Sequence, residues 1–276
     1  MKPKKRSWLH LQLGMLYFRM RRRLQWTFSR VRYTSEQVQT PWEKTPYRHV
    51  AFTHRTLLLR KLRHVDMWLQ HNKVHNLTLA IPRLNGLVLR PGDTMSYWKL
   101  IGNPTKAKGY LPGMVLHEGG FRAETGGGLC QLSNLIYWMT LHTPLTVTER
   151  YRHQYDVFPD SNRTQPFGSG ATCAYNYVDL QIRNDTERTY VLHLFLTETH
   201  LVGEWRTEEP QTERYEVFER EHAFRQEAWG GYTRHNQIWR RVLGEDGEER
   251  RQEFVTENHA IMMYAPLLPE AAAGGN

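Results

Sequence analysis

The pattern of apolar positions is clearest in the middle of the chain. Residues Leu129–His142 have the length of a helix and carry apolar side chains on nearly every face, as a buried helix does. Three consecutive glycines, Gly126–Gly128, precede this segment, and Pro144 follows it. Glycine permits turns that are closed to other residues, and proline ends helices. The pattern therefore predicts one buried central helix that begins directly after a glycine-rich turn.

Earlier in the chain, the spacing favours a helix followed by short strands. Apolar residues recur at helical spacing within Arg55–Gln70, which predicts a helix there. The short apolar runs Leu77–Ile81 and Leu87–Leu89 predict strands, and the Arg90–Asp93 sequence after them is typical of a turn. We therefore expect helices and short strands to lead into the central helix.

Alternating, aromatic-rich segments dominate the chain after Val147. The segments expected as strands are Tyr175–Ile182, Tyr190–Thr197, Leu201–Arg206, Tyr215–Phe218, Tyr232–Leu243 and Arg250–Met263. Gly244–Gly247 lies between the last two and is typical of a hairpin turn. The fold class predicted is α+β, with early helices, one buried central helix and then a mainly antiparallel β-sheet.

The basic residues are concentrated at the N-terminus. Residues 1–35 hold ten of the 37 lysines and arginines and no acidic residue, which leaves 27 basic and 28 acidic residues in 36–276. The formal net charge of +9 therefore describes a tail, and the rest of the chain lacks the basic face that nucleic acids require. We expect no nucleic-acid partner.

The same tail contains an apolar-leaning run, Trp8–Phe18, bracketed by basic residues. Arginines at Arg19–Arg23 follow it where the small residues of a signal-peptide cleavage site would stand, so we expect no cleavage. One interpretation is a basic amphipathic helix on an anionic membrane surface. The other is a solvated basic helix packed on the edge of the domain. The expected location is accordingly the cytoplasm or the inner face of the membrane.

The chain divides into four predicted segments. Residues 1–35 form the basic helical tail, 36–89 a helical and strand lead-in, 90–200 the central domain, and 201–270 a β-rich extension. No apolar run reaches the roughly 18 residues needed to cross a bilayer. The hydrophobic content of 39% is typical of a globular chain with a core of its own.

The glycine turn and the cysteine after it are the most informative stretch for chemistry. We expect Cys130 in the first turn of the central helix, where unpaired N–H groups and the helix dipole favour a thiolate. The same N–H groups, with those of Gly126–Gly128, could stabilise the oxyanion of a tetrahedral intermediate. The alternative is that the glycines form only a tight turn and that Cys130 is a small buried hydrophobic residue.

A cysteine nucleophile normally works with a base. His153 lies beyond the central helix, and the chain could return it to Cys130, with Asp156 or Glu149 orienting the imidazole. His117 is the rival base because it is close to Cys130 in sequence.

A polar loop at residues 160–172 offers a second set of candidates. The guanidinium of Arg163 could bind a substrate carboxylate, or it could instead hold carbonyl groups of the loop. Gly168 and Ser169 follow in the same loop. This loop and the glycine turn could together form a groove for a peptide or a glycan.

The chain has two cysteines, too few for a disulfide framework or a four-cysteine zinc site. Cys173 lies in Thr172–Ile182, a strand prediction that extends Tyr175–Ile182 by three residues, and packing is its expected role there. A disulfide with Cys130 is disfavoured in a reducing compartment. His71 and His75 are four residues apart but have no third ligand nearby, so we expect no metal and no cofactor.

Several ordered motifs resemble the VanW family. The resemblance covers about residues 90–190, and its matching stretches are Pro91–Ser96, Gly126–Ser133, Asp156–Asp160, Arg163–Thr164, Pro166–Thr172 and Tyr177–Leu180. The candidates for oxyanion and substrate binding are Gly126, Gly127, Gly128, Gln131, Ser133, Arg163, Gly168 and Ser169.

The resemblance implies a link to cell-wall metabolism and glycopeptide resistance. The family is named after an accessory protein of B-type vancomycin resistance clusters, and some surface-anchored members are regarded as L,D-transpeptidases that use a cysteine. By this resemblance Cys130 is the motif cysteine and His153 the downstream histidine. Tyr151 departs from the pattern, because many members have a histidine there.

Two functions follow from these residues. In the first, Cys130, His153 and Asp156 catalyse acyl transfer on a peptidoglycan stem peptide or precursor, the expected partner. In the second, the protein is a non-catalytic peptide- or glycan-binding accessory module and Cys130 is structural.

Overall fold

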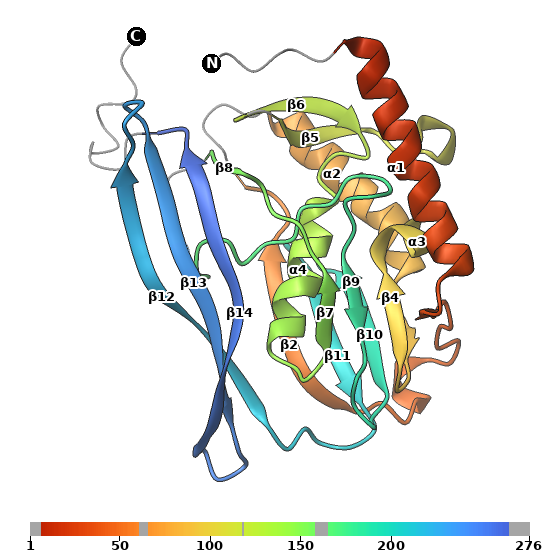
Figure 1. Cartoon of the computed structure of the whole chain (residues 1–276). Helices are drawn as coiled ribbons and strands as arrows, with labels where there is room; N and C mark the ends of the chain where they lie inside the picture. The colour runs from red at the N-terminus through yellow and green to blue at the C-terminus, as the bar shows by residue number, and fades with distance from the viewer. Residues whose placement is uncertain (1–6, 61–65, 118, 158–164, 265–276) are drawn as a thin grey trace.

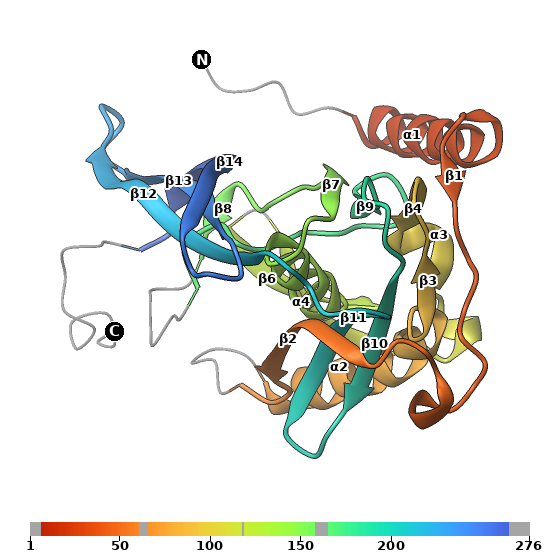
Figure 2. The same ribbon diagram turned by 90° about the horizontal axis from the view of Figure 1, so that it is seen from below.

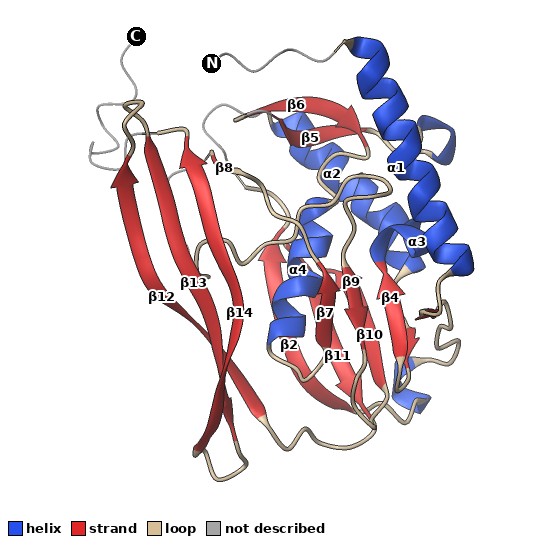
Figure 3. Ribbon diagram, viewed as in Figure 1, coloured by secondary structure: helices blue, strands red, loops and turns tan. Residues whose placement is uncertain are grey.

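The computed structural model of this chain describes residues 7–60, 66–117, 119–157 and 165–264 (Figure 1). Helices and mainly antiparallel sheets together build the described part, which confirms the predicted α+β class (Figure 3). No helix among these residues is both long and apolar enough to span a bilayer. The division into four segments stays a prediction.

The bounds of the elements are as follows. The α-helices are α1 (Trp8–Phe28), α2 (Met67–Ala80), α3 (Tyr97–Ile101) and α4 (Cys130–Leu141), and the short 3-10 helices are η1 (Trp42–Lys44), η2 (Ile81–Arg83) and η3 (Lys106–Lys108). The strands are β1 (Arg32–Tyr33), β2 (His49–Leu57), β3 (Leu87–Leu89), β4 (Asp93–Ser96), β5 (Pro112–His117), β6 (Gly120–Thr125), β7 (Thr146–Glu149), β8 (Tyr155–Asp156), β9 (Gln181–Arg183), β10 (Tyr190–Leu196), β11 (His200–Thr207), β12 (Arg214–Gln226), β13 (Tyr232–Leu243) and β14 (Glu249–Met262).

The central helix α4 packs against the sheet β2-β11-β10-β3, whose strands pair antiparallel. Gly203 in β11 lets the helix approach closely, because a Cβ there would lie 2.7 Å from the Cε of Met139 and 2.9 Å from a methyl group of Leu135. Trp205 in the same strand is fully buried and donates its indole N–H to the Thr140 hydroxyl at 3.2 Å. The core therefore lies between α4 and this sheet.

Two other sheets flank the core. The sheet β1-β4-β9-β7 lies beside α3, and α1 runs along its outer edge (Figure 1). The sheet β12-β13-β14-β8 is formed by long antiparallel strands, with β8 added parallel to β14. Both views place this sheet and α1 on opposite sides of the molecule (Figure 2). The hairpin β5-β6 packs on α2.

The structure corrects three of the predicted elements. The predicted helix Arg55–Gln70 is wrong in its first part, because β2 extends to Leu57 and α2 begins only at Met67. The predicted strand Leu77–Ile81 is instead the end of α2. Only the end of Tyr175–Ile182 lies in a strand. In each case strand pairing or helix packing with distant segments decided the structure, and a local pattern does not contain that information.

Other predicted elements are confirmed. The buried central helix begins at Cys130, directly after the glycine turn, and β3 occupies the predicted residues. The strands β10, β11, β13 and β14 lie within one or two residues of their predicted bounds. Between β13 and β14 the chain turns at Gly244–Gly247, where the Gly247 N–H donates to the Gly244 carbonyl at 2.9 Å.

Candidate functional site

The chain enters α4 through a tight turn. Gly126 and Gly128 have φ values of +78° and +90°, a region that favours glycine. The N–H groups of Gly126 and Gly127 are used, since they donate to the carbonyls of Leu111 and Glu124 at 3.0 and 2.9 Å. Within the described part of the chain, no backbone carbonyl accepts from the N–H groups of Gly128, Leu129 and Cys130. These three are the ones that remain available to an anion.

Neighbouring segments clamp this turn. A Cβ on Gly127 would lie 2.8 Å from the Cα of Gly113 and closer still to its carbonyl group, so both positions require glycine. The side-chain amide of the fully buried Asn76 in α2 donates to the Gly127 carbonyl at 2.9 Å. It also donates to the Leu111 carbonyl and accepts from the Leu111 N–H. The turn is therefore rigid. Asn76 was missed by the sequence analysis, although a polar residue on the apolar face of a helix is a signal for such a role.

A buried lysine also covers the turn. The aliphatic part of Lys73 lies where a Cβ on Gly128 would stand, and its Nζ donates to Gln70 Oε1 at 2.7 Å. Burial lowers the pKa of Lys73 to about 8. The cation beside the turn is thus easier to neutralise than an exposed lysine. The local sequence around Lys73 gives no signal for this contact.

Cys130 lies beside the second cysteine of the chain. Its Sγ is 3.7 Å from Cys173 Sγ and 3.7 Å from the Cys173 carbonyl oxygen, and both residues are free thiols and half-buried. The hydroxyl of Ser133 donates to the Ala171 carbonyl at 2.7 Å and lies 3.4 Å from Cys173 Sγ. Cys130, Cys173 and Ser133 therefore form one cluster at the start of α4, which we call the cysteine pair site.

The two thiols ionise differently. A hydrogen bond from the Cys173 thiol lowers the pKa of Cys130 to about 7, although burial opposes the shift. Burial and the adjacent Cys130 raise the pKa of Cys173 well above its ordinary value. Cys130 is therefore the cysteine of the pair that ionises first, in part already at neutral pH, and Cys173 remains the thiol that donates to it.

Tyr97 of α3 contacts the residue that precedes Cys130. It is fully buried, and its hydroxyl donates to the Leu129 carbonyl at 2.9 Å. Burial and the neighbouring cysteines raise the pKa of Tyr97 well above its ordinary value, so the phenol stays neutral. The bond fixes the residue that precedes Cys130. Sequence spacing gave no signal for this contact.

The predicted base is not hydrogen-bonded to the cysteine. An isolated β-bridge pairs Tyr151 with Thr172, and in this antiparallel arrangement His153 lies on the side of the bridge away from Cys173. Burial lowers the pKa of His153, which keeps its imidazole neutral at pH 7. No hydrogen bond among the described residues joins His153 to Cys130. The role of His153 as base stays a prediction.

Asp156 contacts other partners. Its carboxylate accepts from the Tyr264 hydroxyl at 2.8 Å and lies 3.4 Å from Nη1 of the buried Arg234. Asp156 thereby links β8 to Arg234 in β13, a strand of the same sheet. Its predicted role in orienting His153 also stays a prediction. Arg163 and the side chain of the rival base His117 lie outside the described residues.

The remaining candidates hold the local structure. Gln131 donates to the Thr56 hydroxyl at 2.8 Å and to the Leu57 carbonyl at 2.9 Å, which ties α4 to β2. Gly168 has a φ of +79° and packs against Asn258, and Ser169 is buried. Their substrate-binding roles stay predictions.

The loop that contains Gly168 is fastened from two sides. Arg150 donates to the carbonyls of Gly168 and Gly170, the latter at 2.8 Å. Asn236 and Asn258 donate to the Phe167 carbonyl at 2.7 and 3.4 Å. The long sheet therefore holds this loop in place.

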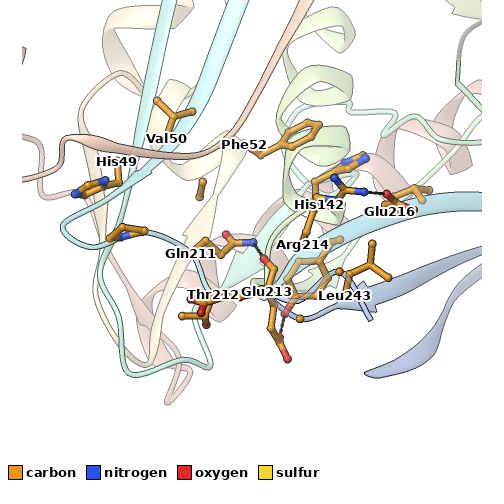
Figure 4. A pocket seen from close by; sticks show the side chains of 17 residues that line it. His49, Val50, Phe52, His142, Gln211, Thr212, Glu213, Arg214, Glu216 and Leu243 are labelled. Carbon is orange, nitrogen blue, oxygen red and sulfur yellow. Dashed lines mark hydrogen bonds and ion pairs between the residues drawn. The ribbon is translucent and has the colours of Figure 1, made fainter. Parts of the chain in front are cut away.

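A pocket of about 900 Å³ opens at the other end of α4 (Figure 4). The residues that line it come from β2, the end of α4 and the ends of β12 and β13, and they include His49, Phe52, His142, Gln211, Arg214 and Glu216. The twelve residues of α4 span roughly 18 Å, so this pocket is separate from the cysteine pair site. Within the described residues, no group of three or more histidine, cysteine or acidic side chains could hold a metal ion.

His142 in this pocket predicts a pH dependence of stability. Its ring stacks on Phe52 at 4.0 Å between centroids, and its Nδ1 donates to the Trp138 carbonyl at 2.9 Å. Burial lowers the pKa of His142 from 6.5 to about 4. The unfolded chain therefore binds the proton first, so this contribution is complete above pH 6.5 and is lost as the pH falls towards 4. We expect a loss of up to about 3 kcal/mol.

Urea unfolding between pH 4 and 7 measures this effect. The His142→Phe variant keeps the aromatic stack but cannot titrate, so its free energy of unfolding should fall less steeply with acid than that of the wild type. Equal slopes for the two proteins would show that His142 is not the group responsible.

Comparisons with known proteins identify the central half of the chain. The family model described as "VanW like protein" matches residues 72–206. The chain is 41% identical over 139 residues to the "Vancomycin B-type resistance protein VanW" of Enterococcus faecalis (strain ATCC 700802 / V583), an alignment that covers 50% of each protein. It is 26% identical over 113 residues to the "Uncharacterized protein YoaR" of Bacillus subtilis (strain 168), covering 41% of this chain and 36% of that protein.

The alignments thus span half or less of the length of these curated relatives. No solved structure matches the chain. The cysteine pair site lies entirely within the matched residues. Residues 72–206 of this chain therefore belong to the VanW family.

Proposed function

We propose that the VanW domain is a cysteine-dependent acyl transferase that acts on a peptidoglycan stem peptide or its precursor. The observation that carries the reaction type is the cysteine pair site: Cys130 Sγ at the start of α4, 3.7 Å from Cys173 Sγ, beside N–H groups that have no acceptor among the described residues. The substrate class rests on the family resemblance. The relative's printed name, which concerns vancomycin resistance, is consistent with it.

In the first step, the Cys130 thiolate attacks the carbonyl carbon of a substrate amide. The C–S bond forms, and the carbonyl oxygen becomes an oxyanion within reach of the N–H groups of Gly128, Leu129 and Cys130. The C–N bond then breaks, and the leaving nitrogen takes one proton from solvent. The product is a thioester on Cys130. Gly127 takes no part as a donor, because Glu124 already accepts its N–H.

In the second step, an amine or a water molecule attacks the thioester carbonyl. The C–S bond breaks, Cys130 leaves as a thiolate, and one proton is released, which balances the proton used in the first step. The Cys173 thiol stays protonated throughout and stabilises the thiolate at the beginning and the end. This arrangement ionises Cys130 without a histidine. The predicted role of His153 as a base is not needed for this ionisation.

Trapping of the thioester tests the proposal. The full chain is incubated with a synthetic stem pentapeptide and analysed by intact-mass spectrometry and peptide mapping. We expect an acyl adduct on Cys130 that disappears in the Cys130→Ser variant, with turnover falling by about a hundredfold or more. Circular dichroism should show that the variant folds normally. The matched Cys173→Ser variant should still form the adduct, more slowly.

The second candidate is a non-catalytic peptide- or glycan-binding module, and the many structural contacts of the glycine turn and of the Gly168 loop favour it. In that case no adduct forms, and the pentapeptide binds the wild type and the Cys130→Ser variant with equal affinity in calorimetry. This result would reject the acyl transferase.

A further inference from the structure

One face of α1 is fastened to the domain. Arg22 is buried and pairs with Glu149, with Nη1 2.8 Å from Oε2, and its Nη2 donates to the Tyr177 carbonyl at 3.1 Å. One turn further on, Trp26 donates its indole N–H to the Ser96 hydroxyl at 3.1 Å. A buried ion pair fixes orientation, because its loss would leave a charge without a partner. The rotation of α1 about its own axis is therefore set.

The opposite face of α1 is apolar and exposed. We call it the outer stripe; its members recur at three- or four-residue spacing and are each more than half exposed, at 54–58%: Leu9, Leu13, Leu16, Met20 and Leu24. Tyr17 adjoins it and is 61% exposed. Both views show α1 at the outer edge of the molecule (Figure 2). A helix in water normally places polar residues on such a face.

Positive charge surrounds the outer stripe. Successive helix residues turn by about 100°, so the exposed Arg21 and Arg23 project to either side of it. Positions 1–35 hold ten basic residues and no acidic one, and two of the ten, Arg22 and Arg32, are already paired with carboxylates of the domain. An apolar face bordered by arginines complements a bilayer that contains anionic lipids, in which apolar side chains enter the acyl boundary and the guanidinium groups meet the headgroup phosphates.

We propose that α1 docks the protein on the surface of an anionic lipid bilayer, with the outer stripe inserted and the helix parallel to the membrane plane. The Arg22–Glu149 pair transmits this orientation to the VanW domain, because Glu149 ends β7. The proposal does not depend on the chemistry of Cys130. A Cys130→Ser variant should bind vesicles as the wild type does, so the two proposals fail separately.

Sedimentation with vesicles tests the docking. The full chain is mixed with vesicles of phosphatidylcholine alone or of phosphatidylcholine with phosphatidylglycerol. We expect binding to the anionic vesicles only, weakened about tenfold or more by the double substitution Leu13→Ser/Met20→Ser. Arg21→Gln/Arg23→Gln should weaken it to a similar degree and reduce its dependence on salt.

The matched control replaces two exposed aromatic residues at the other side of the molecule, one in the turn between β12 and β13 and one in β14. Trp229 and Phe254 are 62% and 54% exposed, and Trp229→Ser/Phe254→Ser should bind vesicles like the wild type. Binding that is unchanged by Leu13→Ser/Met20→Ser, or equal on neutral vesicles, would overturn the proposal. Self-association of the wild type without lipid, lost in the same variant, would instead assign the stripe to a second copy of the chain and overturn it as well.

Discussion

Replacing Cys173 with alanine is expected to slow the alkylation of Cys130 at pH 7 by about tenfold or more. In the wild type the Cys173 thiol holds the pKa of Cys130 at about 7, so half of Cys130 is thiolate at neutral pH. Without this donor, burial and the ordinary acidity of a thiol, with a pKa of about 8.5, leave only a few per cent as thiolate. Because the thiolate is the reacting species, the rate falls in proportion.

Iodoacetamide labelling between pH 5 and 10, followed by mass spectrometry, measures this pKa. Cys173→Ala leaves one cysteine in the chain, so the assignment is direct, and peptide mapping assigns the wild-type signal. Cys173→Ser is the matched control, since its hydroxyl retains a donor near Cys130 and should keep much of the shift. A midpoint that is the same in Cys173→Ala and the wild type would show that the pair does not activate Cys130.

The Gly127→Ala variant is expected to lose about 3 kcal/mol or more of unfolding free energy. The added Cβ would stand 2.8 Å from the Cα of Gly113 and closer to its carbonyl, so two backbone segments would have to separate. That movement would also strain the Asn76 hydrogen bond to the Gly127 carbonyl. Urea unfolding followed by tryptophan fluorescence measures the loss.

The control for this substitution is a glycine in open space. Gly14 lies within α1, and a Cβ there meets no atom within 4 Å, so Gly14→Ala should be neutral or stabilise the protein by about 0.5–1 kcal/mol. If Gly127→Ala unfolds within 1 kcal/mol of the wild type, the turn can relax, and its rigidity is not what positions Cys130.

The parts of the fold that the sequence predicted are those with strong local signals. The apolar, glycine-started helix α4 and the alternating strands β13 and β14 with their Gly244–Gly247 turn could be located from spacing alone. By contrast, the last three residues of β2, Arg55–Leu57, were assigned to a helix, because their pattern is compatible with both structures and only the pairing with β11 decides between them.

The site was predictable only in part. Cys130 and its position at the start of a helix follow from local sequence, but Cys173 stands 43 residues away in an irregular segment, and nothing in the spacing brings the two sulfur atoms together. Similarly, the contact of Asp156 with Arg234 joins residues 78 apart, and no local pattern brings this carboxylate and this guanidinium together. Long-range pairing of this kind is a property of the folded core.

The pairing of β2 with β11 bears on where the VanW domain can be cut. The family match starts at residue 72 and ends at 206, yet β2 lies upstream of it. The strands β13 and β14, whose Asn236 and Asn258 bind the Phe167 carbonyl, lie downstream of it. A fragment of residues 72–206 would leave β11 with an unpaired edge, a template for aggregation. We therefore expect a stable fragment that contains the motif region to require residues 49–57 and 214–262 as well.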